Sequence, residues 1–204
     1  EKLLAYELGY RALPEERVYF TVSTFYNRWS DLLTTDLFDV LQEADPPPTR
    51  TIFPVSFRNG LDGESYGAET WADVWPTLSW RVRAHYAFLR VVMTPKPGSS
   101  DITQRSRYQG GTPRHQARLQ NSFDLPGGVS FDWHLRYQSK MLDPEIPAFA
   151  TSDVRLSWEA RPGLEIEILG RNLHEPHHAE WPGENGGADV EIERSVSFGI
   201  TWRQ

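Results

Sequence analysis

Hydrophobic and polar residues alternate with a period of two along most of the chain. In the clearest run, 129–141, one set of alternate positions holds Val129, Phe131, Trp133, Leu135, Tyr137 and Met141, and the other holds Ser130, Asp132, His134, Arg136, Gln138 and Lys140. Successive side chains of a β-strand point to opposite faces, so this run predicts a strand with one apolar and one charged face. Helical periodicity is nearly absent from the sequence.

The same alternation recurs along the chain and predicts about nine antiparallel strands. Besides 129–141, the expected strands are 3–11, 17–31, 64–75, 78–92, 115–125, 149–160, 164–173 and 195–203. In 78–92 the apolar positions begin at Leu78 and Trp80. Several segments have about 12 residues or more, and such strands, tilted by about 45°, cross about 28 Å, close to the thickness of a bilayer core. Strands of soluble sandwiches more often have about 5 or 6 residues.

The expected connections alternate between short and long. Short turns rich in Pro, Gly or Glu are expected at Pro14-Glu15-Glu16, Trp75-Pro76-Thr77, Pro126-Gly127-Gly128 and Arg161-Pro162-Gly163, and long loops at 32–62, 93–114, 141–149 and 174–191. Residues 50–58 are expected to add a strand of a small hairpin inside the first long loop. Short turns at one edge of a sheet and long loops at the other are typical of outer-membrane barrels, with the turns periplasmic and the loops extracellular.

Composition narrows the classes of function. The mean hydropathy of -0.55 does not separate a soluble protein from a barrel, whose strands place only every second residue in lipid. No run approaches the roughly 18 apolar residues of a membrane helix, and the absence of cysteine excludes disulfides and thiolate metal sites. A net charge of -7 argues against nucleic-acid binding. The sequence opens at Glu1 without an initiator Met or a signal-peptide pattern, so we expect a longer parent protein in which any signal peptide lies outside this sequence.

Several phrases resemble the C-terminal strands of TonB-dependent receptors, in the order in which that family shows them. Residues 4–11, LAYELGYR, resemble a strand with a recurrent Glu-Leu-Gly core, and a short turn and a long strand ending in 26–29, YNRW, follow. Next come Asn59-Gly60 with 66–69, YGAE, then Asn172-Leu173 with 178–181, HAEW, and finally the closing strand from Glu193 to Arg203. Family members usually end on an aromatic residue, whereas Trp202 is followed here by Arg203 and Gln204.

This resemblance implies an all-β fold, namely an antiparallel up-and-down segment of an outer-membrane β-barrel of about 22 strands. Residues 1–204 would form the C-terminal portion of the barrel, without the plug domain and about 13 earlier strands. The implied function is uptake of a scarce nutrient, such as an iron-siderophore or cobalamin-like complex, across the outer membrane of a Gram-negative bacterium. The implied partners are membrane lipid and lipopolysaccharide, the plug domain and the TonB complex, the barrel-insertion machinery and a small-molecule ligand; no cofactor is implied.

Within such a barrel the two faces of each strand receive different roles. The residues expected to face the lumen are Glu69, Arg81, Arg83, Asp132, Arg136, Glu165 and Glu167, and those expected to face lipid are Trp80, Phe131, Trp133, Leu135, Phe198, Ile200 and Trp202. The lumen charges are expected to pair with each other and with the plug, or to guide an anionic ligand. Trp75, Trp158 and Trp202 fall near the short turns, where an interfacial aromatic girdle is expected.

Other functions remain open on the sequence. A soluble β-sandwich that binds carbohydrate would hide the apolar face between two sheets. A barrel lipase would use His115, Ser122 and Asp124, the residue types of a catalytic triad, although no nucleophile elbow surrounds Ser122. The segment 174–180 contains His174, His177 and His178 with Glu175 and Glu180, residue types that bind zinc or iron, but its spacing fixes no tetrahedral geometry.

Overall fold

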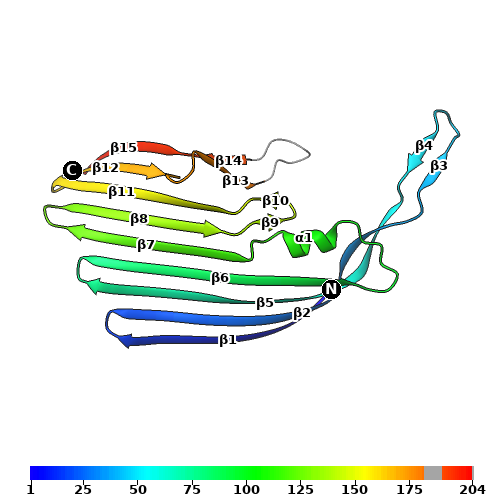
Figure 1. Cartoon of the computed structure of the whole chain (residues 1–204), viewed down its shortest axis with the longest axis horizontal. Coiled ribbons are helices and arrows are strands. Elements are labelled where there is room, and N and C mark those ends of the chain that lie inside the picture. Colours follow the sequence, from blue (N-terminus) through cyan, green and yellow to red (C-terminus); the bar gives the residue numbers. More distant parts are fainter. Residues whose placement is uncertain (182–189, 204) are drawn as a thin grey trace.

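A computed structural model describes residues 1–181 and 190–203 and contains one large antiparallel sheet of nine strands (Figure 1). Among these nine, each strand pairs with the next along the chain, in the order β1-β2-β5-β6-β7-β8-β11-β12-β15. Their bounds are β1 Lys2–Glu15, β2 Val18–Leu37, β5 Val55–Thr77, β6 Trp80–Pro95, β7 His115–Leu125, β8 Val129–Gln138, β11 Phe149–Arg161, β12 Leu164–Arg171 and β15 Ser195–Trp202. The nine strands expected from the alternation are therefore confirmed.

The connections separate by length onto the two edges of the sheet. The turns β1–β2, β5–β6, β7–β8 and β11–β12 are short and lie at the same edge (Figure 1), whereas the other connections are long and lie at the opposite edge. β2 has 20 residues and β5 has 23, so both extend beyond the neighbouring strands at the loop edge. In the described residues β1 and β15 each pair on one side only.

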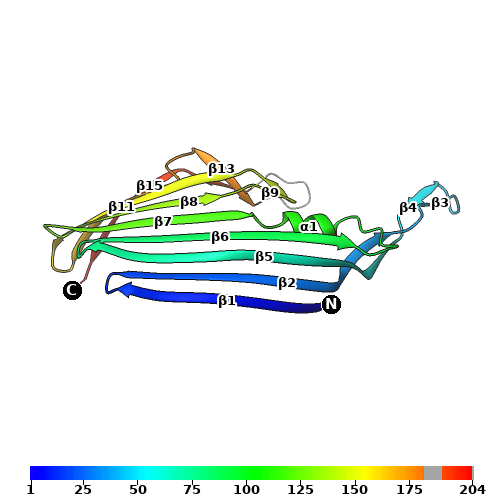
Figure 2. The same cartoon turned by 60° about the horizontal axis from the view of Figure 1, so that its bottom comes forward.

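Smaller elements occupy the long connections. Two-stranded hairpins are formed by β3 Leu41–Glu43 with β4 Arg50–Ile52, by β9 Met141–Leu142 with β10 Glu145–Ile146, and by β13 His177–Trp181 with β14 Val190–Glu193. The expected hairpin strand at 50–58 corresponds to β4, while β5 begins at Val55. The β3–β4 hairpin stands at the tip of an arm that projects away from the sheet (Figures 1 and 2).

A single helix in the described residues, α1 Gln104–Gly110, was not expected from the sequence. Its two turns are too short to show a helical repeat, and it is initiated by the Asp101 carboxylate, which accepts hydrogen bonds from the backbone N–H groups of Gln104 (3.2 Å) and Arg105 (2.7 Å). Tyr108 of α1 packs against the buried cluster Leu32, Leu61 and Met93. In the described part of the chain, no helix is long and apolar enough to cross a membrane.

Two residues at strand ends depart from the expected alternation. Leu78 is 88% exposed, because it lies with Ser79 in the turn that joins β5, which ends at Thr77, to β6, which begins at Trp80. Met141 does not continue the apolar face of β8, which ends at Gln138. It is instead buried and pairs with Ile146 in the β9–β10 hairpin.

The glycines of the short turns are required by backbone geometry. Gly128 and Gly163 have φ values of 75° and 84°. Residues other than glycine rarely adopt this backbone conformation, because their Cβ atom clashes with the backbone. A Cβ on Gly163 would also lie 2.5 Å from the carbonyl oxygen of Arg203, and one on Gly128 would lie 2.9 Å from that of Glu159. These turns therefore fit closely against the adjacent strands.

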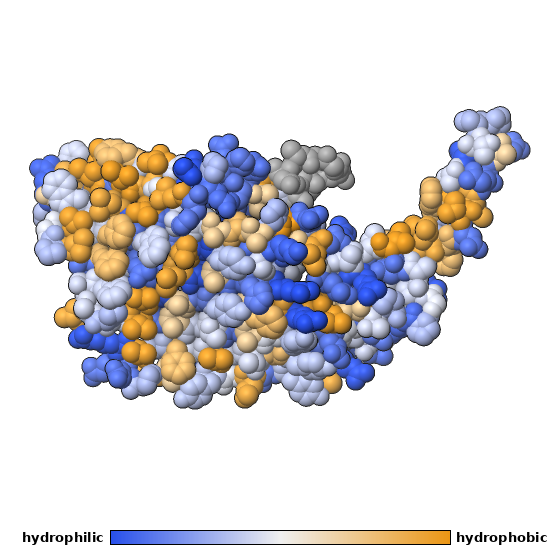
Figure 3. All heavy atoms as spheres, viewed as in Figure 1, coloured by the Kyte–Doolittle hydropathy of each residue, from blue (hydrophilic) through white to orange (hydrophobic). Residues whose placement is uncertain are grey.

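The large sheet is one curved layer (Figure 2) with no second sheet over either face in the described residues, where the other three sheets have two strands each. Leu156 on β11 and Ile168 on β12 remain 44% and 49% exposed, although both lie on strands with neighbours on each side. Figure 3 shows apolar side chains gathered over β12 and β15 and near the base of the β3–β4 arm. This arrangement contradicts the sandwich alternative, which needs a sheet packed against the apolar face.

Candidate functional site

The strand register sorts the sheet into a polar face and an apolar face. Residues directly opposite each other on paired strands share a face, and the register places all seven residues of the expected lumen set on one face: Glu69, Arg81, Arg83, Asp132, Arg136, Glu165 and Glu167. We call this the polar face. The opposite, apolar face carries Trp80, Phe131, Trp133, Leu135, Phe198, Ile200 and Trp202.

On the polar face, three of the expected residues meet at Arg155 of β11, which sequence reasoning did not single out. The Arg155 guanidinium lies 3.5 Å from Asp132, 2.5 Å from Glu165 and 2.9 Å from Glu167. The signal was present, because Arg155 alternates with Val154 and Leu156 on the expected strand 149–160. One arginine thus joins strands β8, β11 and β12 through their carboxylates.

A second ion-pair group forms around Asp73 of β5. Arg81 donates two hydrogen bonds to the Asp73 carboxylate, with Nε to Oδ1 at 2.8 Å, and Arg83 Nε lies 3.6 Å from Oδ2. The ring of Trp75 lies under Arg81, at 4.7 Å from the guanidinium carbon to the ring centroid. Trp75 therefore contacts the polar face, because it lies two positions after Asp73 on β5, and its expected place in an aromatic girdle is wrong.

The remaining two residues of the set are separated from these groups. Glu69 is exposed on β5 and forms no ion pair with the described residues. Arg136 of β8 is paired with Glu180, which lies outside the large sheet on β13. The sequence therefore predicted the face that these residues share but not which of them make contact.

Residues of the last loop hold the β13–β14 hairpin against the polar face. Asn172, with a φ of 53° and only 2% exposed, accepts a hydrogen bond from Thr151 Oγ1 (2.7 Å) and donates one to the carbonyl of Ile192 (2.8 Å). Asn tolerates this left-handed backbone conformation better than most residues. Asn172 thereby connects β11 to β14.

His178 continues this network. Its ring stacks on Phe149 with centroids 4.2 Å apart, Nδ1 lies 3.2 Å from Asn172 Oδ1, and Nε2 lies 2.8 Å from Glu180 Oε1. Burial by itself would raise the pKa of Glu180, but the hydrogen bonds from His178 and Arg136 outweigh burial and lower it. Both ring nitrogens of His178 are therefore engaged by neighbouring side chains.

Neither the metal site nor the catalytic triad considered from the sequence is assembled in the described residues. Within residues 1–181 and 190–203, no group of three or more His, Asp or Glu side chains could hold a metal ion. His115 lies on the apolar face beside Tyr86, whose hydroxyl is 2.8 Å from Nδ1, whereas Ser122 and Asp124 lie on the polar face. Ser122 donates to Asp132 (2.6 Å). The spacing of seven residues between His115 and Ser122 sends them to opposite sides of β7.

The apolar face carries a band of aromatic rings near the short turns. Trp80 stacks on Phe123 with centroids 5.5 Å apart, and Phe123 contacts Phe131 at 6.0 Å. Asn121, a polar residue on this face, is covered because its side-chain oxygen accepts a hydrogen bond from the Trp80 indole (3.2 Å). An exposed aromatic and aliphatic surface with its polar atoms satisfied is suited to contact with lipid.

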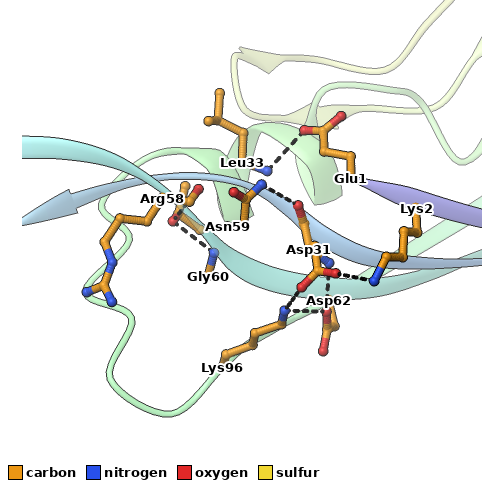
Figure 4. Close-up of polar contacts among 10 residues, drawn as sticks. Glu1, Lys2, Asp31, Leu33, Arg58, Asn59, Gly60, Asp62 and Lys96 are labelled. Atoms are coloured by element: carbon orange, nitrogen blue, oxygen red, sulfur yellow. Dashed lines mark hydrogen bonds and ion pairs between the residues drawn. The ribbon is translucent and has the colours of Figure 1, made fainter.

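A polar cluster joins the strands at the loop edge (Figure 4). Lys96 contacts Asp31 and lies 3.3 Å from Asp62, and Lys2 lies 3.3 Å from Asp31. Asn59 donates to the carbonyl of Asp31 (2.6 Å), where β2 has a bulge and a φ of 61°. The hydrogen bond to the Asp31 carboxylate raises the pKa of Lys96. The bases of the first two long loops are thus tied to β1.

These features define a class of protein: a segment of an outer-membrane β-barrel with one charged face, one apolar face and elaborated loops. Residues 1–173 match the family model described as TonB dependent receptor-like, beta-barrel. The chain belongs to this family, whose members are transporters of the Gram-negative outer membrane and not enzymes. A search of curated protein sequences finds no match.

Solved structures of whole receptors share the fold at low sequence identity. The FrpB iron transporter from Neisseria meningitidis (F3-3 variant) superposes with a TM-score of 0.71 and 11% identity, over 98% of this chain and 31% of its own. The E. coli ferric-catecholate import receptor Fiu gives a TM-score of 0.68 and 16% identity, over 97% and 26%. The ferric yersiniabactin uptake receptor FyuA from Yersinia pestis gives 0.65 and 18%, over 98% and 29%. The chain spans between about a quarter and a third of the length of these relatives.

Proposed function

We propose that this chain forms the C-terminal nine strands of the barrel of a TonB-dependent receptor that imports a scarce, bulky nutrient. The observation that carries the proposal is the two-faced single sheet, with long loops at one edge and short turns at the other. In a closed barrel the apolar face meets lipid and the polar face lines the lumen. The plug domain and the earlier strands would come from other parts of the parent protein.

The expected roles of the two residue sets follow from this proposal. The lumen set, Glu69, Arg81, Arg83, Asp132, Arg136, Glu165 and Glu167, would line the path of the ligand and contact the plug. The lipid set, Trp80, Phe131, Trp133, Leu135, Phe198, Ile200 and Trp202, would contact lipid tails and, near the loops, lipopolysaccharide. The aromatic strand β15 at the C-terminal side of the sheet would be presented to the barrel-insertion machinery, and TonB would act through the plug.

An iron chelate is the preferred nutrient, ahead of a cobalamin-like complex. The structural relatives are an iron transporter and receptors for ferric catecholate and ferric yersiniabactin. Sequence identities of 11–18% show a shared fold and not a shared ligand. The choice of an iron chelate for this chain is therefore part of the proposal.

Uptake by intact cells tests the function. Cells whose sole outer-membrane iron receptor is the full-length protein should accumulate radiolabelled iron from at least one chelate, and deletion of TonB should abolish the accumulation. A matched strain without the receptor gives the background. Accumulation of labelled cobalamin in place of iron would correct the nutrient, and uptake that persists without TonB would contradict the proposed mechanism.

A further inference from the structure

A row of side chains crosses the polar face, and the positive charges in this row outnumber the carboxylates that pair with them in the described residues. The register places Trp71, His85, Arg118, Arg136 and Thr151 opposite one another on five adjacent strands, β5, β6, β7, β8 and β11. We call these five residues the basic row. It contains two arginines and a histidine and no carboxylate.

The pairing of Arg118 with Arg136 is unfavourable by itself. Like charges directly opposite each other on antiparallel strands destabilise the pair. Among residues 1–181 and 190–203, no carboxylate forms an ion pair with Arg118 or His85. This contrasts with Arg155, around which three carboxylates gather a short distance along the same face. Within the described residues, the sheet therefore neutralises one arginine fully and leaves another unpaired.

Arg83 lies on the same face, one position from His85 toward the short turns. Its Nε is buried and lacks a hydrogen-bond partner among the described residues. The nearest carboxylate, Asp73 at 3.6 Å, is already occupied by Arg81. A buried donor without an acceptor is costly, and the Arg83 side chain, which is 32% exposed, also lines the groove described next.

The chain itself shows which chemistry the basic row accepts. Glu180 reaches from β13 to Arg136, the fourth of the five residues in the row, and places a carboxylate there. Beside it a groove of about 570 Å³ is lined by Trp71, Arg83, His85, Arg118, His134 and Arg136. The one carboxylate in this lining, Asp153, accepts a hydrogen bond from the backbone N–H of Asn172 (2.9 Å). This volume falls within the range of small-molecule sites, about 300 to 1,000 Å³.

We propose that the basic row, with Arg83, binds the carboxylate groups of a small multivalent anion, such as a carboxylate-bearing metal chelate, and that Glu180 competes with this anion for Arg136. Arg118 is the central residue of the site, since it is exposed and holds no partner in the described residues. The inference rests on the proposed function, in which the polar face lines the lumen. It adds a ligand class and a location for its binding.

Equilibrium dialysis of labelled citrate against the purified full-length receptor in detergent, at low ionic strength, tests the proposal without TonB or transport. Arg118→Gln should weaken citrate binding about tenfold or more, because it removes a charged hydrogen-bond donor. The matched control is Arg90→Gln, which makes the same change on β6 but on the apolar face, opposite Tyr66, and should leave binding unchanged. Glycerol, which is uncharged, should not compete with citrate.

Glu180→Gln supplies a prediction of opposite sign. This variant leaves Arg136 without its internal carboxylate, so citrate binding should become several-fold tighter. Arg118→Gln should also raise the melting temperature of the unliganded receptor, since it removes the like-charge pair. A higher melting temperature would show that the Arg118→Gln variant is folded, so its weaker citrate binding would come from the loss of the Arg118 side chain and not from unfolding.

Three results would overturn the site. They are no citrate binding by the wild-type protein, equal losses in Arg118→Gln and Arg90→Gln, and weaker binding in Glu180→Gln. The first result would also arise if an acidic segment of the rest of the receptor filled the row, and it would reject a small-molecule site. None of them would affect TonB-dependent iron uptake, so failure of this inference is distinguishable from failure of the proposed function.

Discussion

At the scale of single residues, Glu180 links a loop hairpin to the wall of the sheet. Its carboxylate contacts both Arg136 and His178, and these contacts lower its pKa. A group whose pKa is lowered on folding contributes stability that is complete above the unfolded pKa, about 4.3 for Glu, and that is lost as the pH falls through the folded value.

We therefore expect the β13–β14 hairpin to loosen in acid. Hydrogen exchange of its backbone amides, corrected for intrinsic rates, should show strong protection near neutral pH and a loss of protection beginning below about pH 4.3. Glu180→Gln should lower the protection at neutral pH by about 1 to 2 kcal/mol. The variant and the wild type should converge in acid, and a difference that persists there would contradict the role of the carboxylate.

Single residues also show how far the sequence predicts contacts. Asn172 was recognised only as part of a phrase shared with a family, yet its side chain joins Thr151 to Ile192, residues 41 positions apart along the chain. Arg155 and Arg118 have the same residue type and the same alternation, but one meets three carboxylates and the other meets an arginine. Alternation assigns a side chain to a face; its partners depend on the register between strands, which a single strand does not encode.

At the scale of elements, strands were predictable and their ends were not. Period-two alternation is a local property, so all nine long strands followed from it. The bulge at Pro76, the end of β8 at Gln138 and the extension of β2 and β5 depend on contacts with other segments. Helix α1 was missed because seven residues are too few to establish a helical period.

The short turns provide a test of how closely these elements fit. Gly163 and Gly127 have similar φ values, 84° and 80°, but a Cβ on Gly163 would meet the Arg203 carbonyl at 2.5 Å whereas one on Gly127 would meet nothing within 4 Å. Gly127→Ala should cost about 1 to 2 kcal/mol through backbone strain alone, and Gly163→Ala should cost clearly more. Urea unfolding of the receptor in lipid vesicles measures the loss of unfolding free energy in both variants. Equal losses would contradict the close fit, because they would show that the backbone around Gly163 shifts at no cost to accept the Cβ atom.

At the scale of the whole molecule, the sheet lacks a conventional core. The few fully buried apolar side chains, such as Leu61 and Ile146, lie at the loop edge, while the long apolar face is exposed. Composition did not reveal this, because the residues of the apolar face and the polar face average to a polar mean hydropathy of -0.55. The alternation of apolar and polar residues along the chain predicts the two faces, whereas the mean hydropathy does not.

Substitutions on the two kinds of apolar surface should therefore behave differently. Trp133→Arg should destabilise the receptor in lipid vesicles by about 2 to 4 kcal/mol, the cost of a cation near the middle of a bilayer. Trp133→Leu should cost little, because fluid lipid fills the vacated space. The matched control Leu61→Ala, in the buried cluster, should cost about 2 to 5 kcal/mol through the cavity that it leaves. A comparable loss for Trp133→Leu would indicate a packed protein surface over the apolar face.

The central claim is that the apolar face of this sheet meets lipid while the polar face lines an aqueous interior. Single cysteines placed in turn at residues 129–138 on β8, a segment with no cysteine of its own, can each carry a nitroxide label in the receptor reconstituted in vesicles. Collision with oxygen, which concentrates in lipid, should then be highest at odd positions such as Trp133, and collision with a water-soluble nickel chelate should be highest at even positions such as Arg136. A packed protein interface over the apolar face would instead give low accessibility to both reagents at the odd positions, and that result would contradict contact between this face and lipid.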